Sequence, residues 1–351
     1  MALIECTKEG LYVAAADVYI DPWRRVRKAL ITHGHSDHSR WGHQQYICTH
    51  QNKPIIKHRL GDINVSGIDY GEDLLINGVK FTFHPAGHIV GSAQIRVEHR
   101  GEVWVVSGDY KTEDDGISGA YQPIKCHTFI TECTFGLPIY SWIPQAQVFE
   151  KINNWWSTNR SNGVTSILTG YSLGKAQRLL AGMDAGIGPI YTHGAVEQMN
   201  AVIRGAGIPL PNTIHLTDMV SKKELEGGLV ITPQGATRSN WMKRFGKVSL
   251  ANASGWMQLR GARRRGGADR GFVLSDHADW QGLNEAIAAT GAETIFVTHG
   301  YTDVLKRWLL SKGYDAKVVK TKFEGELAEE GSTEGPNASL SQDEESLKDL
   351  T

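Results

Sequence analysis

The fold of this chain is decided by Ile31-Thr32-His33-Gly34-His35-Ser36-Asp37-His38. The apolar-leaning run 28–32 that leads into it predicts a strand delivering a tight loop. Imidazole nitrogens and carboxylate oxygens at this density suit a divalent metal, above all zinc. Because alternate residues of an extended chain share a face, the first two histidines can converge on one ion and the Asp-His pair can reach a second. A histidine-rich surface loop is the alternative, but the H-x-H-x-D-H spacing is far more specific than an isolated histidine pair.

The composition indicates a globular chain. Its 351 residues correspond to about two domains, and 40% apolar content is enough for ordinary cores. The four cysteines show no C-x-x-C spacing, which argues against a disulfide framework and a zinc ribbon. No run of about 18 apolar residues occurs, and residues 1–10 lack the layout of a signal peptide. We therefore expect a cytoplasmic protein with no membrane partner.

The charge is unevenly distributed along the chain. Residues 324–351 contain nine acids and one base, so the preceding residues carry +7 against an overall net charge of −1. A basic folded part favours binding of nucleic-acid phosphates, although a solvated basic surface without a partner is an open alternative. The acidic segment 322–351 is poor in aromatic residues and is expected to be a disordered tail.

The first third of the chain is predicted to be mostly strand and turn. Residues 11–20 are expected to form one strand, and Asp21 at its end could orient a metal-bound histidine through the second ring nitrogen or simply cap a turn. Asn77-Gly78 and Arg100-Gly101 each separate two apolar segments and predict hairpins.

Two later loops carry further metal-ligand types. His88 lies in Pro85-Ala86-Gly87-His88, beside a glycine that allows close backbone approach. Asp109 follows the predicted strand 103–107 directly. Each signal is weak in isolation and gains weight from the preceding histidine loop.

From about residue 140 the pattern changes to alternating helices and strands, which predicts a parallel α/β unit inserted into the first one. Within it, Gly170-Tyr171-Ser172-Leu173-Gly174-Lys175 has too few residues between its glycines for a Walker motif. A helix capped by Ser172, with Lys175 in its first turn, could still hold a backbone phosphate. Plain helix capping is the alternative.

The last part of the chain combines basic residues with strand-end histidines. His277 follows the predicted strand 271–275, and His299 follows the strand 293–298. An arginine cluster close to such a site suits phosphate contacts, while a solvated loop is the alternative. The candidate nucleic-acid contacts outside the glycine-rich segment are Ser254, Arg260, Arg263, Arg264, Arg265 and Arg270.

Together these motifs resemble the metal loops of the metallo-β-lactamase superfamily, and Glu132, His277 and His299 make the chain similar to the β-CASP nucleases. The resemblance implies a four-layer αββα sandwich formed by residues 1–139 and 251–321, interrupted by an inserted β-CASP α/β domain at 140–250. Phrases such as Tyr19-Ile20-Asp21-Pro22-Trp23 and Pro85-Ala86-Gly87-His88 are similar to those of compact bacterial ligase-associated DNA-damage-response exonucleases.

The resemblance also implies roles for individual residues. One metal would be held by His33, His35, His88 and Asp109, and the other by Asp37, His38, Asp109 and His299. Zinc is the expected ion, and manganese is the alternative. His277 would act as general acid with Glu132 orienting it, because an imidazole beside a carboxylate retains its proton.

The function implied is hydrolysis of nucleic-acid phosphodiesters with two metals, most simply by a DNA exonuclease of DNA repair, with an ATP-dependent DNA ligase and a helicase as partners. An RNA-processing nuclease of the same family and a nonenzymatic nucleic-acid scaffold stay open as alternatives. A small-molecule hydrolase is a weaker alternative, because it would need neither the insertion nor the late acid and histidines.

Overall fold

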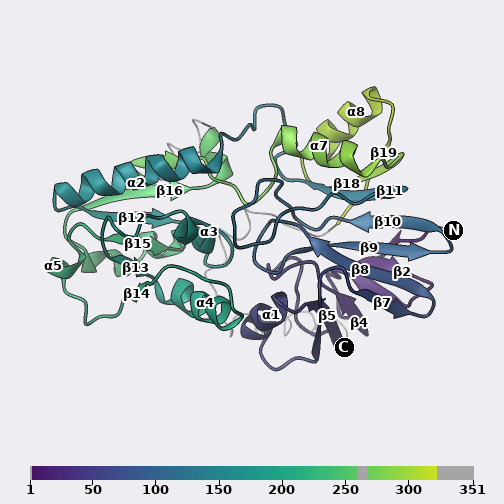
Figure 1. Ribbon diagram of the computed structural model, residues 1–351, viewed down its shortest axis with the longest axis horizontal. Coiled ribbons are helices and arrows are strands. Elements are labelled where there is room, and N and C mark those ends of the chain that lie inside the picture. Colours follow the sequence, from purple (N-terminus) through teal and green to yellow (C-terminus); the bar gives the residue numbers. More distant parts are fainter. Residues whose placement is uncertain (1, 260–266, 322–351) are drawn as a thin grey trace, which may run out of the picture.

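The structure, a computed structural model, describes residues 2–259 and 267–321. The acidic tail and the candidate phosphate contacts Arg260, Arg263, Arg264 and Arg265 lie outside these residues. Within the described part the chain forms three sheets and the helices that cover them, so the expected α/β class is confirmed (Figure 1).

The first sheet contains six short strands in chain order. The single strand expected at 11–20 was wrong, because the chain turns at Ala14–Asp17, where Asp17 has a φ of 53°, and pairs with itself. This turn contains neither glycine nor proline, so it has no sequence signal of the usual kind. The strands are β1 (Glu5–Cys6), β2 (Leu11–Val13), β3 (Val18–Ile20), β4 (Lys28–Leu30), β5 (Gln45–Thr49) and β6 (Val65–Ile68).

The second sheet contains seven strands in the order β19-β18-β11-β10-β9-β8-β7. Its two predicted hairpins are confirmed: Asn77-Gly78 and Arg100-Gly101 both have two consecutive positive φ angles, as type I′ turns require. The strands are β7 (Asp73–Ile76), β8 (Val79–Pro85), β9 (Ala93–His99), β10 (Glu102–Val106), β11 (Thr128–Cys133), β18 (Thr294–Gly300) and β19 (Asp315–Val318).

These two sheets pack face to face. One apolar cluster contains Leu11 and Ile20 of the first sheet together with Phe81 and Val97 of the second. The outer face of the first sheet is covered by α1 (Asn52–Leu60), and that of the second by α7 (Trp280–Thr290) and α8 (Thr302–Ser311). The layers therefore follow the order helix, sheet, sheet, helices (Figure 1).

The third sheet is parallel throughout and has the strand order β14-β13-β15-β12-β16-β17. It extends to Phe272, whereas the inserted unit was expected to end at residue 250, because β16 and β17 pair with β12 and with each other. The strands are β12 (Thr165–Thr169), β13 (Ile190–Thr192), β14 (Ile214–His215), β15 (Leu229–Thr232), β16 (Val248–Ala253) and β17 (Arg270–Phe272).

Helices pack on both faces of this third sheet. On one face an apolar cluster joins the sheet to α2 (Gln145–Ser161), α3 (Lys175–Ala181) and α4 (Gly194–Gly205). A second cluster joins it to α5 (Lys222–Leu225) and the 3-10 helix η2 (Asn240–Arg244). Two more 3-10 helices, η1 (Gln234–Arg238) and η3 (Gly255–Gln258), follow β15 and β16. Among the described helices, none has the length and apolar composition to cross a bilayer.

Candidate metal centre

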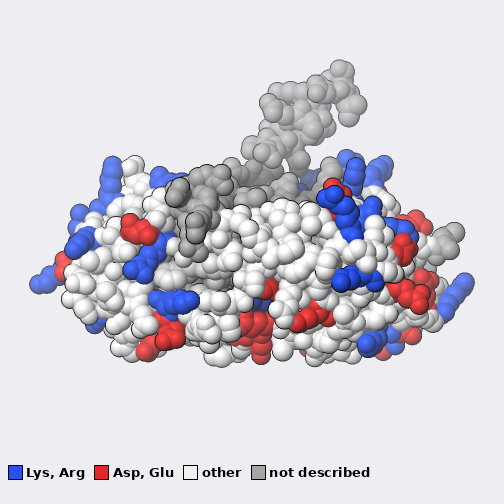
Figure 2. Space-filling model, turned by 90° about the horizontal axis from the view of Figure 1, so that it is seen from above, with Lys and Arg blue, Asp and Glu red and all other residues white. Residues whose placement is uncertain are grey.

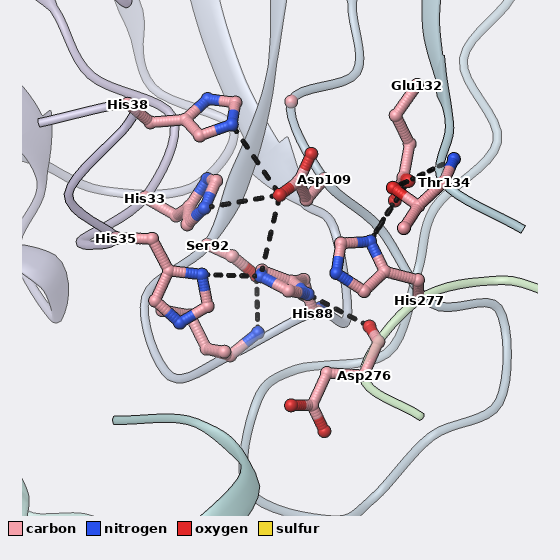
Figure 3. Close-up of polar contacts among 12 residues, drawn as sticks. His33, His35, His38, His88, Ser92, Asp109, Glu132, Thr134, Asp276 and His277 are labelled. Carbon is pink, nitrogen blue, oxygen red and sulfur yellow. Dashed lines mark hydrogen bonds and ion pairs between the residues drawn. The ribbon is translucent and has the colours of Figure 1, made fainter. Parts of the chain in front are cut away.

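The predicted ligand residues converge at one buried place, although they come from loops far apart in the chain (Figure 3). The loop after β4 supplies the first histidines, the loops after β8 and β10 supply His88 and Asp109, and β18 supplies His299 near its end. Their donor atoms lie within 4.8 Å of one another in three overlapping groups. These groups are His33, His35, His88 and Asp109; His33, Asp37 and His38; and His38, Asp109 and His299. A fourth group with the same spacing consists of Asp109, Glu132 and His277.

Asp109 lies at the centre of the cluster. Its Oδ2 is 3.6 Å from His33 Nε2, 3.5 Å from His38 Nε2 and 3.9 Å from His88 Nε2. Its Oδ1 is 3.4 Å from His299 Nδ1. Two ligands bound at roughly 2.0–2.1 Å to one tetrahedral ion are about 3.3 Å apart, so these separations are those of atoms facing a shared cation.

The pair of His35 and His88 gives a sharper test of whether a cation fits. His88 Nδ1 lies 2.9 Å from the Asp276 carbonyl oxygen, and His35 Nε2 lies 3.2 Å from that of Leu173. Carbonyl oxygens only accept, so both of these nitrogens donate. The inner nitrogens, His88 Nε2 and His35 Nδ1, then present lone pairs to each other at 3.1 Å when both rings are neutral. This arrangement is repulsive unless a proton or a metal ion lies beside both atoms.

The electrostatics favour the same assignment. Burial lowers the pKa of His33 and of His88 well below the usual range, which keeps both rings in the neutral form that binds metals. Burial also lowers the pKa of His38, but the Asp37 and Asp109 carboxylates outweigh it and raise that pKa to about 10. The buried carboxylates thus stabilise a positive charge beside them, and a bound cation would supply that charge without protonating His38.

Two buried atoms at the cluster have no hydrogen-bond partner among the residues that the structure describes. They are His33 Nε2 and Asp109 Oδ1. Buried polar atoms are rarely left unsatisfied in folded proteins, because desolvation without a partner is costly. The donor set, in which imidazoles outnumber carboxylates, fits zinc or a similar transition metal.

Asp21 is hydrogen-bonded to one histidine of the loop. Its Oδ2 accepts from His38 Nδ1 at 2.8 Å, and its Oδ1 accepts from the Thr32 backbone N–H at 2.8 Å. These bonds turn His38 Nε2 toward Asp109. Asp21 has a φ of 43°, in the left-handed region that ordinary residues seldom adopt, and strain of this kind is concentrated at functional sites.

His277 lies beside the cluster and is held by Glu132. Its Nδ1 is 2.8 Å and 3.0 Å from the two Glu132 carboxylate oxygens, and its ring centroid is 4.6 Å from that of His88. Glu132 is fixed in turn by the backbone N–H groups of Tyr110 and Thr134, at 2.9 Å and 3.2 Å. The second nitrogen of His277 therefore faces the group around Asp109 (Figure 3).

His299 occupies a strained position near the end of β18. It has a φ of 58°, and its backbone carbonyl accepts from the Cys133 thiol at 3.0 Å. Burial lowers the pKa of His299, but the Asp109 carboxylate beside it outweighs that effect and raises the pKa.

A cleft of about 670 Å³ leads from the histidine loop 31–38 to the third sheet. His35 and Ser36 line one end, and the residues after β12, β13, β15 and β16 line the other. Ligands of parallel α/β sheets bind outside the carboxyl ends of the strands, so this location is typical of a substrate site. The lining residues that the sequence did not single out include Arg59, Thr169, His193, Gln234, Ser239 and Asn252.

Of the described candidate phosphate contacts, the two serines line the cleft and the lysine does not. Ser172 and Ser254 line the cleft, but Gly174 rather than Ser172 precedes the first residue of α3, and Ser254 caps η3. Lys175 does not reach the cleft surface. It is fully buried, with its ammonium 3.5 Å from Asp276, so the expected contact with a backbone phosphate was wrong.

Charged side chains are dispersed over the face of the molecule shown in Figure 2. On the face shown in Figure 2, lysine and arginine side chains lie mostly toward the two ends of the molecule, and acidic groups lie along the lower edge. Arg270 is exposed at the start of β17. The overall positive charge of the first 323 residues is therefore not gathered into one broad basic area on the described part of this face.

Comparisons with known proteins give partial matches. No family model matches the sequence. The chain is 28% identical over 314 residues to a protein named Probable DNA ligase from Opitutus terrae, which covers 88% of this chain and 30% of that protein. It is 30% identical over 122 residues to Endoribonuclease YSH1 from Yarrowia lipolytica, which covers 34% of this chain and 14% of that protein. The chain thus matches less than a third of the length of either relative.

A solved structure shares the fold. A crystal structure of a protein of unknown function from Enterococcus faecalis V583 aligns with 85% of this chain and 80% of its own, with a TM-score of 0.57 and 11% sequence identity. At this identity the likeness concerns the fold alone. The mixed α/β architecture of the chain is therefore one that occurs in at least one other solved protein.

Proposed function

We propose that this chain is a metal-dependent nuclease of the metallo-β-lactamase/β-CASP kind. The observation that carries the proposal is the pair of inner nitrogens of His35 and His88, which face each other at 3.1 Å while both outer nitrogens donate to carbonyl oxygens. The Endoribonuclease YSH1 relative supports the nuclease activity by its name. The layer order helix, sheet, sheet, helices and the separate parallel sheet support the fold assignment, with the core formed mainly by residues 1–139 and 273–321.

The residues present fit two ions. His33, His35, His88 and Asp109 would hold one, and Asp37, His38, Asp109 and His299 the other. When bound, two divalent ions supply Lewis-acid activation of a phosphodiester and of the attacking water. Asp109 can serve both positions because its Oδ2 faces His33 of the first set and His38 of the second, while its Oδ1 faces His299 of the second.

The chain itself supplies proton transfer and substrate placement. His277 would donate a proton from its second ring nitrogen to the departing oxygen, while Glu132 holds Nδ1 and keeps the ring in that orientation. The cleft that opens at His35 and Ser36 would hold the nucleic-acid strand, with the hydroxyls of Ser172 and Ser254 along its wall.

DNA is the substrate that we favour, with exonucleolytic removal of nucleotides at ends that are to be repaired. The relative named as a DNA ligase supports this, because its match covers 88% of the chain against 34% for the endoribonuclease. A nuclease that trims ends would prepare them for a ligase. RNA is the second candidate, and the endoribonuclease name supports it. A nonenzymatic scaffold would not require the complete set of ligands and the ordered Glu132–His277 pair.

One experiment tests this function. The purified protein is incubated with end-labelled single-stranded DNA, duplex DNA and RNA of one sequence, with zinc or manganese, and the product ladder is read. We expect a ladder of shortened DNA products that requires metal. Preferential cleavage of RNA would select the second candidate, and a metal-loaded protein that cleaves none of the three would contradict the proposal.

A further inference from the structure

Two basic side chains of α3 are buried next to the candidate metal centre. Arg178 is 1% exposed and Lys175 is fully buried. Long charged side chains are rarely buried to this extent without ionic partners, because water solvates them well. The segment 170–178, which begins with the glycine-rich motif, therefore points its two positive charges into the protein. The groups that these charges contact indicate what the side chains do.

Arg178 binds groups from three different loops. Its Nε lies 3.1 Å from Asp276 Oδ1, and its Nη2 lies 3.2 Å from Asp115 Oδ2. Nη2 also donates to the backbone carbonyl oxygens of Gly87 at 3.0 Å and His88 at 3.3 Å. Lys175 contributes the second charge, with its ammonium 3.5 Å from Asp276 Oδ2. Two cations and two carboxylates thus balance inside the molecule.

These contacts converge on two histidines of the proposed reaction. Asp276 directly precedes His277, and its backbone carbonyl accepts from His88 Nδ1 at 2.9 Å. The same guanidinium therefore holds the loop that carries His88 and the residue next to His277. The rings of these histidines lie 4.6 Å apart, so a small displacement of either loop changes their relation.

We propose that Arg178 is a positioning residue that sets His88 and His277 relative to each other. It links α3, which packs on the third sheet, to the loops that carry the proposed metal ligand His88 and the proposed proton donor His277. The inference rests on the proposed function, since His277 has a reaction to serve only if that function is right. Arginine is required because its planar fork reaches several acceptors at once, whereas lysine is a point charge.

The test compares Arg178→Lys with Arg204→Lys as a matched control. Arg204 also belongs to a helix of the third sheet and forms an ion pair, at 3.0 Å with Glu197. Its hydrogen-bond partners among the described residues are Glu197, Pro211 and Thr213, which are not part of the site. Loss of groups that orient metal ligands typically costs 10- to 100-fold in affinity or activity. We expect Arg178→Lys to lower kcat on DNA by about this factor with KM nearly unchanged, and Arg204→Lys to leave both unchanged. Equal kinetics in the two variants, compared at equal folded fractions, would overturn the proposal.

A second readout does not depend on activity. With selectively ¹⁵N-labelled histidine, the His88 Nδ1 proton is observed by NMR and assigned by its absence in His88→Gln. We expect a protected resonance in the parent protein and in Arg204→Lys, and fast exchange or loss of that resonance in Arg178→Lys. An unchanged resonance in Arg178→Lys would also overturn the proposal.

This readout separates the two proposals from each other. If the parent protein cleaves no nucleic acid, the proposed function fails, while the His88 resonance still decides the positioning role. If Arg178→Lys does not fold, Asp276→Asn replaces it, because this variant keeps the backbone carbonyl and removes one partner of the guanidinium. The same loss of protection at His88 is expected, and full protection there would contradict the role.

Discussion

The histidine loop 31–38 and the segment 170–178 meet at one cleft, yet their sequences predicted the surroundings of their polar side chains with unequal success. In the loop, the donors lie within six residues of one another, and local geometry brings them together. In the second segment, Lys175 and Arg178 have a partner about a hundred residues further along the chain, Asp276. A short motif therefore predicts the surroundings of its side chains best when part of the cluster, such as His33, Asp37 and His38, lies within it, and misleads when the partner comes only from a distant loop.

The largest expected effect concerns the loop itself. His33→Ala removes a buried nitrogen that faces Asp109 at 3.6 Å, and we expect loss of bound metal together with nearly all activity. Metal analysis and cleavage rates measure both. His50→Ala changes a histidine outside the cluster and serves as the control. A His33→Ala protein that keeps its metal and its cleavage rate would contradict the metal-binding role of the histidine loop, and with it the difference drawn between the two regions.

His277→Ala should lose rate but keep metal. General acid catalysis is typically worth 10²- to 10⁴-fold, so a loss of about that size is expected on DNA. A nitrophenyl phosphodiester, whose leaving group needs no proton, should recover much of the activity. An equal deficit on both substrates, or depleted metal, would remove His277 from the acid role.

Asp21→Asn tests the support of the loop. Asparagine keeps the shape but lacks the charge that holds His38 Nδ1 at 2.8 Å, so we expect metal affinity to fall by about 10- to 100-fold. Competition with a chromophoric chelator measures it. Asp17→Asn, at another turn of the first sheet, is the control. Wild-type affinity in Asp21→Asn would reduce Asp21 to a residue that caps its turn.

The smallest effect is expected from the arginine cluster. Neutralising Arg263, Arg264 and Arg265 should weaken DNA binding and flatten its salt dependence, because each lost phosphate contact removes a slope of roughly 0.7–0.9 in log K against log salt. Binding titrations over a range of salt concentrations measure this slope. An unchanged slope would place these arginines outside the binding surface.

The sequence predicted best those features that depend on neighbours in the chain. The hairpins at Asn77-Gly78 and Arg100-Gly101 are confirmed, because two positive φ angles in succession favour these residue types. The α/β class is confirmed as well, since alternating helices and strands are a local pattern.

Tertiary pairing explains where the structure differs from what the sequence led us to expect. The turn at residues 14–17 exists because β2 and β3 pair with each other. No residue type in the turn predicts this pairing. The third sheet ends at Phe272 because β17 pairs with β16, although the two strands are separated by the segment that follows η3. Lys175 is buried because Asp276 accompanies it from another part of the chain.

The central claim, that the buried histidines and carboxylates form a two-metal centre, is tested most directly by elemental analysis. Protein that was never exposed to chelator is purified, and its transition metals are counted per chain. We expect close to two equivalents, since the donor groups fill two sites that share Asp109. A reproducible content of zero, with activity unaffected by prolonged chelation, would contradict the account.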